Sequence, residues 1–348
     1  MASNRLEYFI KRFILIVPTF LGITFACFAL AQFTPGGPVD MAVLRMKGQT
    51  DGEAGQGASS DATISPEQLE AIRKNFGFDK PLLMRYWKYL VTDRLGMASN
   101  SFKFRNRTAW ELILERLPVS LTFGITGFIL SYLICVPLGI AKALRNGSRF
   151  DAITSVIILI GYAIPPFVLG MVLKMLFSGT VEGLWNIFPH AGFVSENFDE
   201  LSFFGKVRDM AWHMFLPVIC YMVGHFAVLT ILMKNSLLEE IAKDYVRTAR
   251  AKGCSVSRSI WIHALRNSLI PIATGFGGIL MIMFAGSVLI EQVFEIPGIG
   301  RLSLESIVGR DYPVFMGIVT LTAILGLLGQ ILSDFCYVII DPRIDFNK

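Results

Sequence analysis

The sequence predicts an all-α integral membrane protein with six transmembrane helices and a long outer segment after the first of them. Hydrophobic residues make up 53% of the 348 positions and charged residues only 17%, which is too apolar for an ordinary soluble protein. Six stretches without Asp, Glu, Lys or Arg are each long enough to cross the bilayer core, which takes about 20 helical residues. These stretches are residues 13–33, 117–141, 152–173, 211–233, 267–290 and 312–333.

Lysine and arginine are concentrated in the segments that would face the cytoplasm if the N-terminus is inside. Apart from Lys174 at the end of the third span, the short outer loops of that topology hold only Lys206, Arg208, Arg301 and Arg310. Because short cytoplasmic loops carry the excess of positive charge in membrane proteins, both termini are expected to face the cytoplasm. The net charge of +5 follows from this asymmetry, so a nucleic-acid-binding function is not expected.

Residues 1–33 are expected to form the N-terminal transmembrane helix. The basic start, the apolar run and the sequence Ala29-Leu30-Ala31 are also typical of a cleavable signal peptide. The uncharged run is longer than a usual signal core, so we expect the helix to remain in the protein.

Residues 34–116 follow as a long outer, periplasmic segment. Within it, residues 48–62 contain no large apolar residue and are expected to be disordered. Residues 81–92 have the pattern of a short helix. The aromatic side chains Tyr86, Trp87 and Tyr89 in this helix suit either the membrane interface or contact with a substrate-delivery protein, and both interpretations remain open.

Residues 117–341 are expected to form a transmembrane domain of five helices, followed by a cytoplasmic tail of residues 342–348. The sequence GYAIPP interrupts the third span, because Pro165 and Pro166 each remove a helical hydrogen bond and clash with the preceding turn. Such a break is tolerated at membrane depth where it lines a wet cavity or is packed in protein. Both interpretations remain open.

Two histidines lie in the fourth span, with His213 near its outer end and His225 nearer its middle. An ionisable residue within a span is a candidate functional residue. A hydrogen bond between helices is the alternative explanation. Pro165, Pro166 and His225 are therefore the candidate residues of a translocation path.

The longest charged run between two spans in the second half of the chain is the inner loop of residues 234–271. Ser236 and the glutamate three residues later have the capping-box spacing, which predicts a helix that begins there. Gly253 stands where a left-handed residue would end this helix. Ser255 or Ser257 can then cap a second helix that runs to the end of the loop.

The first of these two helices carries one narrow apolar stripe, formed by Leu237, Ile241, Tyr245 and Ala249 at intervals of four residues. So short a helix is not stable alone in water, so the stripe needs a surface against which it is buried. A basic amphipathic helix can lie on the inner leaflet. This stripe is thin and has no Trp or Phe, which favours a groove on another protein.

Several blocks of the chain resemble a known family. They are DYVRTARAKG at residues 244–253, HALRNSLIP at residues 263–271, the run EQVFEIPGIGRLSLESIVGRDYPVFMG from Glu291, and the ending SDFCYVIIDPRIDF. These blocks resemble permease subunits of bacterial binding-protein-dependent ABC importers of the dipeptide, oligopeptide and nickel branch. NGSRFD, GYAIPPF and DPRIDF are most similar to permeases of peptide importers that also admit microcin C.

Two positions depart from the family pattern. Arg247, Thr248 and Ala249 stand where the general importer pattern has Glu-Ala-Ala, and only the third of them matches. Gln330 stands where asparagine is usual. The resemblance covers nearly the whole chain apart from residues 48–62.

The resemblance implies a type I ABC importer permease fold, located in the bacterial inner membrane. It also implies three kinds of partner: a second homologous permease subunit, two ATP-binding subunits or one fused ATPase, and a periplasmic or lipoprotein peptide-binding protein. ATP and Mg would bind to the partner subunits, and this chain would hold no cofactor and no metal. The residues expected to couple the chain to the ATPase are Leu237, Ile241, Asp244, Tyr245, Arg247, Ala249, Ala251 and Gly253.

The energy for transport is expected to come from a partner, because the sequence contains no G-x-x-x-x-G-K-[ST] phosphate loop. An ion-gradient-driven transporter needs titratable groups at mid-membrane. Lys174, Glu291 and Asp334 lie toward span ends instead, where snorkelling or interfacial pairing explains them. We therefore expect a non-catalytic permease subunit that passes peptides. The alternatives are a secondary transporter and a permease for nickel or another small solute.

Overall fold

The computed structural model describes residues 2–33, 80–104, 106–179, 185–275 and 287–340. The predicted disordered segment 48–62 and the predicted tail 342–348 lie outside these residues, as do residues 276–286 of the predicted fifth span. The chain forms two compact units. The larger consists of Met1–Arg12, Arg116–Arg301 and Leu325–Lys348, and the smaller of Phe13–Glu115 and Leu302–Ile324.

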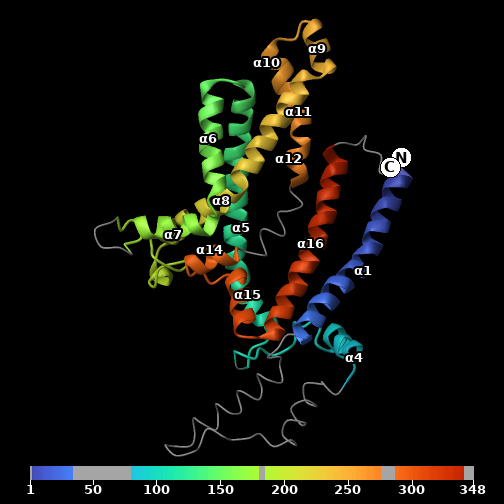
Figure 1. Ribbon diagram of the computed structural model, residues 1–348, viewed down its shortest axis with the longest axis vertical. Helices are drawn as coiled ribbons and strands as arrows, with labels where there is room; N and C mark the ends of the chain where they lie inside the picture. Colours follow the sequence, from blue (N-terminus) through green and yellow to red (C-terminus); the bar gives the residue numbers. More distant parts are fainter. Residues whose placement is uncertain (1, 34–79, 105, 180–184, 276–286, 341–348) are drawn as a thin grey trace, which may run out of the picture. The chain divides into compact units, whose positions relative to one another are not determined.

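Helices make up the regular structure of the described part (Figure 1). Four of them are long and apolar enough to cross a membrane, and each contains one predicted span. These four are α1 (Ala2–Phe33), α5 (Ala109–Leu144), α8 (Phe203–Ala242) and α16 (Tyr312–Ile340). The others are α4 (Leu82–Trp87), α6 (Arg149–Ala163), α7 (Pro166–Phe177), α9 (Asp244–Ala251), α10 (Val256–Arg258), α11 (Leu265–Ser268), α12 (Ile270–Thr274), α14 (Val288–Val293) and α15 (Ile299–Val308). Two π-helical segments, η1 (Lys88–Thr92) and η3 (Ser259–Ala264), and a 3-10 turn, η2 (Phe198–Glu200), complete the set.

The predicted break in the third span, residues 152–173, is confirmed. The chain forms two helices here, α6 and α7, which are bent by 94° at Ile164 and Pro165 (Figure 1). Ile164 is extended because the ring of a following proline disfavours the helical conformation. Pro166 then starts α7, where its missing N–H costs no hydrogen bond.

A buried ion cluster joins α5, α6 and α8 within the larger unit. The Asp151 carboxylate lies 3.1 Å from Lys142 Nζ and 2.7 Å from Lys234 Nζ. Lys142 Nζ also donates to the hydroxyl of Thr154 at 2.8 Å and to that of Ser155 at 2.7 Å. Lys142 lies in α5, which continues past it to Leu144, and its side chain is 1% exposed.

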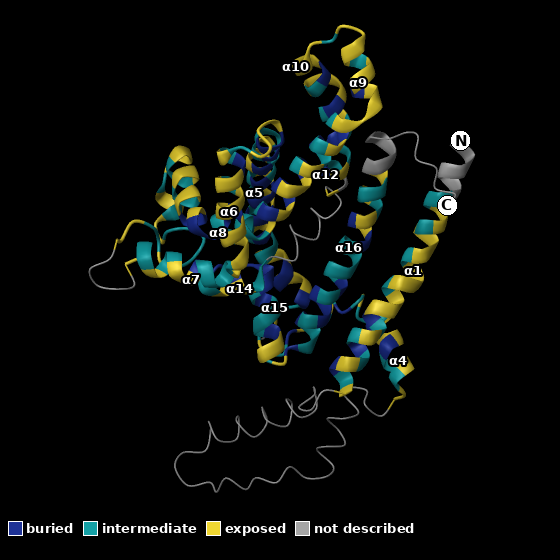
Figure 2. Cartoon of the chain, turned by 45° about the horizontal axis from the view of Figure 1, so that its top comes forward, coloured by how far each residue is buried: buried dark blue, intermediate teal, exposed yellow. Residues whose placement is uncertain are grey.

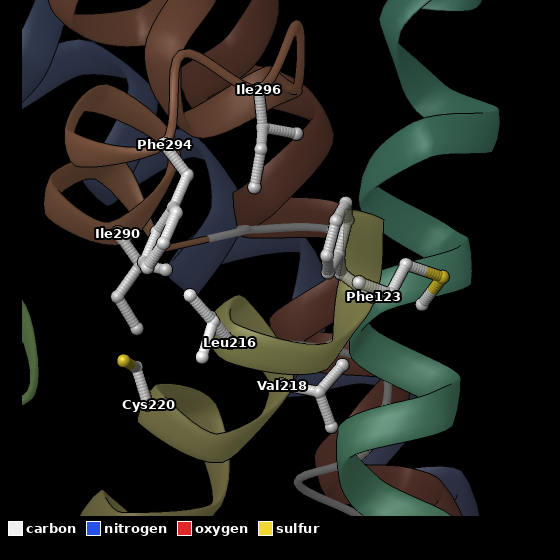
Figure 3. Close-up of a cluster of buried hydrophobic side chains, with 8 residues drawn as sticks. Phe123, Leu216, Val218, Cys220, Ile290, Phe294 and Ile296 are labelled. Carbon is white, nitrogen blue, oxygen red and sulfur yellow. The ribbon is translucent and has the colours of Figure 1, made fainter. Parts of the chain in front are cut away.

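A hydrophobic cluster holds α5, α8 and α14 together (Figure 3). Phe123 of α5 and Leu216 of α8 face side chains from the segment around α14. Helix α7 joins this cluster at Gly170, where an added Cβ would lie 3.0 Å from the ring of Phe294. The labelled members of the cluster are Phe123, Leu216, Val218, Cys220, Ile290, Phe294 and Ile296.

Glu291 is fully buried beside this cluster, so the prediction that it snorkels or pairs at a span end is wrong. Its carboxylate accepts hydrogen bonds from Arg301 N at 2.7 Å and from Ser120 Oγ at 3.3 Å. The first bond satisfies one of the free N–H groups at the start of α15. Gly298 packs so closely that an added Cβ would lie 2.5 Å from the carboxyl group.

Lys174 and Asp334 do have ionic partners, as predicted. Lys174 Nζ lies 3.1 Å from Glu295 Oε1 and donates to the carbonyl of Val293 at 2.9 Å. Asp334 forms an ion pair with Arg12.

In the smaller unit, α4 and η1 confirm the short helix predicted for residues 81–92. Tyr86 and Tyr89 are buried against Phe28 of α1, whereas Trp87 between them is 66% exposed. The Tyr86 hydroxyl lies 2.7 Å from Thr24 Oγ1, and the Tyr89 hydroxyl is hydrogen-bonded to Thr320. Both tyrosines therefore hold α4 and η1 to α1 and α16.

We expect Asp151→Asn to lower the free energy of unfolding by about 3 kcal/mol, because two largely buried ammonium groups would lose their counterion. The measurement is the midpoint of thermal unfolding in detergent. Asp244→Asn is the matched control, since the Asp244 side chain is 94% exposed, and it should leave the midpoint unchanged. Equal effects of the two substitutions would contradict the importance of the cluster.

Glu291 should make stability depend on pH. Burial raises its pKa to about 7, against the opposing effect of the bonds from Arg301 and Ser120. Because the folded pKa lies above the unfolded one, this contribution is fully present at low pH and is lost as pH rises through the folded pKa. The unfolding midpoint should therefore fall between about pH 5 and pH 8, and Glu291→Gln should flatten that dependence. An unchanged slope in the variant would assign the effect to another group.

Candidate functional site

The loop between α8 and α12 forms a helical hairpin (Figure 1). We call residues 243–268 the docking hairpin. It consists of α9, a turn, α10, η3 and α11. Helix α9 is coloured mostly as exposed in Figure 2. A charged, solvent-exposed helix therefore stands at the end of the long helix α8.

The first hairpin helix does not begin at Ser236, so that prediction is wrong. Helix α8 runs without a break to Ala242, and Lys243 is the extended residue between α8 and α9. The Ser236 hydroxyl donates to the carbonyl of Ser268 at 2.9 Å instead of capping a helix. Packing of Leu237, which is 0% exposed, keeps this part of α8 helical and overrides the local capping signal.

The predicted apolar stripe is divided by the break at Lys243. Leu237 on α8 is buried in the core, while Tyr245 on α9 is 37% exposed. Val246, which the sequence did not single out, is the buried residue of α9 and packs with Leu237 and Ala264. Of the other predicted coupling residues, Ile241 and Ala249 are half-buried, whereas Asp244, Arg247, Ala251 and Gly253 are exposed.

A hydrogen-bonded network fastens α9 to its two neighbours. The Tyr245 hydroxyl donates to Glu240 Oε2 at 2.5 Å and accepts from Asn267 Nδ2 at 3.1 Å. Lys243 Nζ donates to Glu240 Oε1 at 2.5 Å. Burial and the bond to Glu240 raise the pKa of Tyr245 to about 12, so the hydroxyl keeps its proton at neutral pH. Glu240 and Asn267 lie outside the predicted site, and no local pattern pointed to them.

The end of α9 confirms the prediction for Gly253, whose φ is +91°. Gly253 N donates to the carbonyl of Arg250 at 3.0 Å, and Cys254 N donates to that of Ala249 at 3.1 Å. These two bonds form a Schellman motif. Ser255 caps α10 by accepting from Arg258 N, which confirms one of the two predicted caps.

The candidate path residues lie near one another. Pro166 packs against Gly224, where an added Cβ would lie 3.5 Å from the proline ring. His225, the next residue, lines a cavity of about 220 Å³ with Tyr132 and Tyr221. Pro165 is exposed at the bend.

The second histidine of α8 has a different environment. His213 is buried, and its Nδ1 lies 2.9 Å from the carbonyl of Asp209, one turn earlier in the same helix. The predicted bond between helices is therefore replaced by one within α8. Among the described residues, no three His, Cys, Asp or Glu side chains are placed to hold a metal ion.

Comparison with known proteins identifies the family. Residues 135–346 match the model of the binding-protein-dependent transport system inner membrane component. The chain belongs to this permease family. As a member, it is a membrane component of a transport system.

Relatives of the permease match over nearly their whole length. The peptidoglycan transport system permease protein YejB of Agrobacterium fabrum is 41% identical, with 98% of each chain covered. The inner membrane ABC transporter permease protein YejB of Escherichia coli O157:H7 is 40% identical, with 98% of this chain and 99% of the relative covered. The dipeptide transport system permease protein DppB of Escherichia coli strain K12 is 33% identical, with 99% and 100% covered.

A solved structure shows the fold of the permease. The MetNI methionine ABC transporter in an inward-facing conformation aligns with a TM-score of 0.50 and 16% identity. The alignment covers 67% of this chain and 97% of the other. The expected ABC importer permease fold is thereby confirmed.

Gly253→Val should loosen the end of α9, because a β-branched residue at positive φ is strained by about 1–2 kcal/mol. Hydrogen exchange of the amides around residue 253 should become about tenfold faster. Ala251→Val is the control, since it adds the same side chain at an exposed position within the helix. If both variants exchange alike, the left-handed residue is not what ends the helix.

Proposed function

We propose that this chain is the permease subunit of an ATP-driven importer that passes peptides across the bacterial inner membrane. The observation that carries the proposal is the match, over nearly the full chain, to permeases named for peptidoglycan and dipeptide transport. The exposed docking hairpin supports it, because a chain without a phosphate loop needs a surface on which an ATPase can act.

The docking hairpin is the proposed contact with the ATPase. Asp244, Arg247 and Ala251 would touch the partner directly, because they are exposed on α9. Leu237 is buried within this chain, so its contribution to coupling is to hold α8 in place. Ile241, Tyr245, Ala249 and Gly253 complete the proposed set and keep α9 oriented. ATP and Mg would bind on the partner subunits.

Helix α8 is the proposed connection between the ATPase and the path. It runs unbroken from Phe203 to Ala242, which is about 60 Å of helix at 1.5 Å per residue. His225 lies on it, next to the Gly224 contact with Pro166. A displacement at the docking hairpin would therefore reach Pro165, Pro166 and His225 without crossing a flexible loop.

The proposed assembly has a second homologous permease, two ATP-binding subunits or one fused ATPase, and a periplasmic or lipoprotein peptide-binding protein. The proposed topology has six spans, with both termini and the docking hairpin in the cytoplasm. Switching the pore almost completely from its inward-facing to its outward-facing state needs a free-energy difference of about 5.5 kcal/mol. Binding and hydrolysis of ATP by the partner subunits would supply it.

The test is uptake of a labelled tripeptide by proteoliposomes that contain the complex and its binding protein. Uptake should require ATP and Mg. Tyr245→Asp should reduce it by roughly tenfold or more, because a second carboxylate would face Glu240.

Three outcomes of this test would contradict the proposal. Uptake driven by an ion gradient without ATP would indicate a secondary transporter. Uptake of nickel or another small solute in place of peptide would overturn the assigned cargo. Normal peptide uptake by the Tyr245→Asp variant would argue against the coupling role of α9.

A further inference from the structure

Helix α9 has little to hold it in place apart from its hydrogen bonds. It has eight residues, and Val246 is its one buried side chain. So short a helix gains little stability from its own backbone. One end is a single-residue joint, the extended Lys243, and the other is the turn of residues 252–255, which contains the left-handed Gly253. A Cβ added at Gly253 would meet nothing within 4 Å, so this turn is not packed from outside there.

The hydroxyl of Tyr245 is the point where α8, α9 and α11 meet. It donates to Glu240 of α8 and accepts from Asn267 of α11. Glu240 is 9% exposed, and a hydrogen bond to a carboxylate shielded from water is stronger than one at an open surface. A tyrosine hydroxyl can donate and accept at once, so one side chain fixes α9 to both neighbours.

Helices α8 and α11 are joined to each other by a separate contact. Ser236 of α8 donates to the carbonyl of Ser268 in α11 at 2.9 Å. Loss of the Tyr245 bonds would therefore leave these two helices paired and would leave α9 held to them mainly by the packing of Val246. This separation makes the role of the network testable.

Building on the proposed function, we propose that Glu240, Tyr245 and Asn267 form a positioning network that makes α9 move as one body with α8 and α11. The three residues do not contact ATP or cargo. They convert a displacement of the exposed face of α9 into a displacement of α8. Without them, the ATPase would still dock on α9 and hydrolyse ATP, but α9 would turn at Lys243 and Gly253 instead of moving α8.

The test compares peptide uptake with ATP hydrolysis in the reconstituted complex. Tyr245→Phe keeps the ring and removes both bonds of the hydroxyl. We expect the peptide imported per ATP to fall by about fivefold, which corresponds to about 1 kcal/mol. Tyr162→Phe is the matched control, because Tyr162 is 54% exposed on α6. This variant should import as much peptide per ATP hydrolysed as the wild type.

If Tyr245→Phe is unstable, a second variant and hydrogen exchange test the same network. Asn267→Ala leaves the tyrosine and the carboxylate in place and should also lower the ratio. The double variant, Tyr245→Phe with Asn267→Ala, should import as much peptide per ATP as Tyr245→Phe alone, because both changes break the same network. Hydrogen exchange in residues 244–251 of the assembled complex should become faster in each variant.

The outcomes separate this inference from the proposed function. A wild-type ratio in Tyr245→Phe and Asn267→Ala would overturn the positioning network while ATP-dependent uptake still stood. Loss of the ATPase from the purified variant complex would also overturn it, because the network would then serve docking rather than transmission. Uptake without ATP in the wild type would instead overturn the proposed function.

Discussion

Buried acidic side chains join the helices of the larger unit, and the rest of that unit depends on each of them having its hydrogen bonds satisfied. Asp151 holds α5, α6 and α8 through two lysines, and Glu291 holds α14, α5 and the start of α15. Glu240 does the same for α8 and α9. A buried charge without partners is costly, so each of these sites strongly favours one arrangement of its helices.

This way of joining helices suits a membrane protein. Lipid chains are as apolar as leucine, so hydrophobicity alone does not hold helices together in a bilayer. Close packing and polar contacts take its place. At Gly139 of α5, an added Cβ would lie 2.6 Å from Met233 of α8, so these two helices touch almost at the backbone. The cluster around Phe123 adds a packed core to the same unit (Figure 3).

The same contacts explain how a small helix can act on a long one. The charged residues of α9 are exposed, while Val246 and the Tyr245 hydroxyl keep that helix attached to α8. Helix α8 then continues without a break past the cavity beside His225. In the proposed function, the docking surface on α9 is therefore separate from the candidate path residues beside His225.

Local chemistry allowed the sequence alone to predict several features, since each depends on residues a few positions apart. These are the four of its six apolar spans that form single long helices, the break before Pro165, the left-handed Gly253 and the Ser255 cap. The end of α8 at Ala242, the burial of Val246 and the surroundings of Glu291 were decided by the tertiary structure. Glu291 is bonded to Ser120, which lies 171 positions away, and Tyr245 is bonded to Asn267, which lies 22 positions away. No pattern of neighbouring residues records such a pair, because a buried polar group is satisfied by whichever distant donor the packing of helices brings within hydrogen-bond distance.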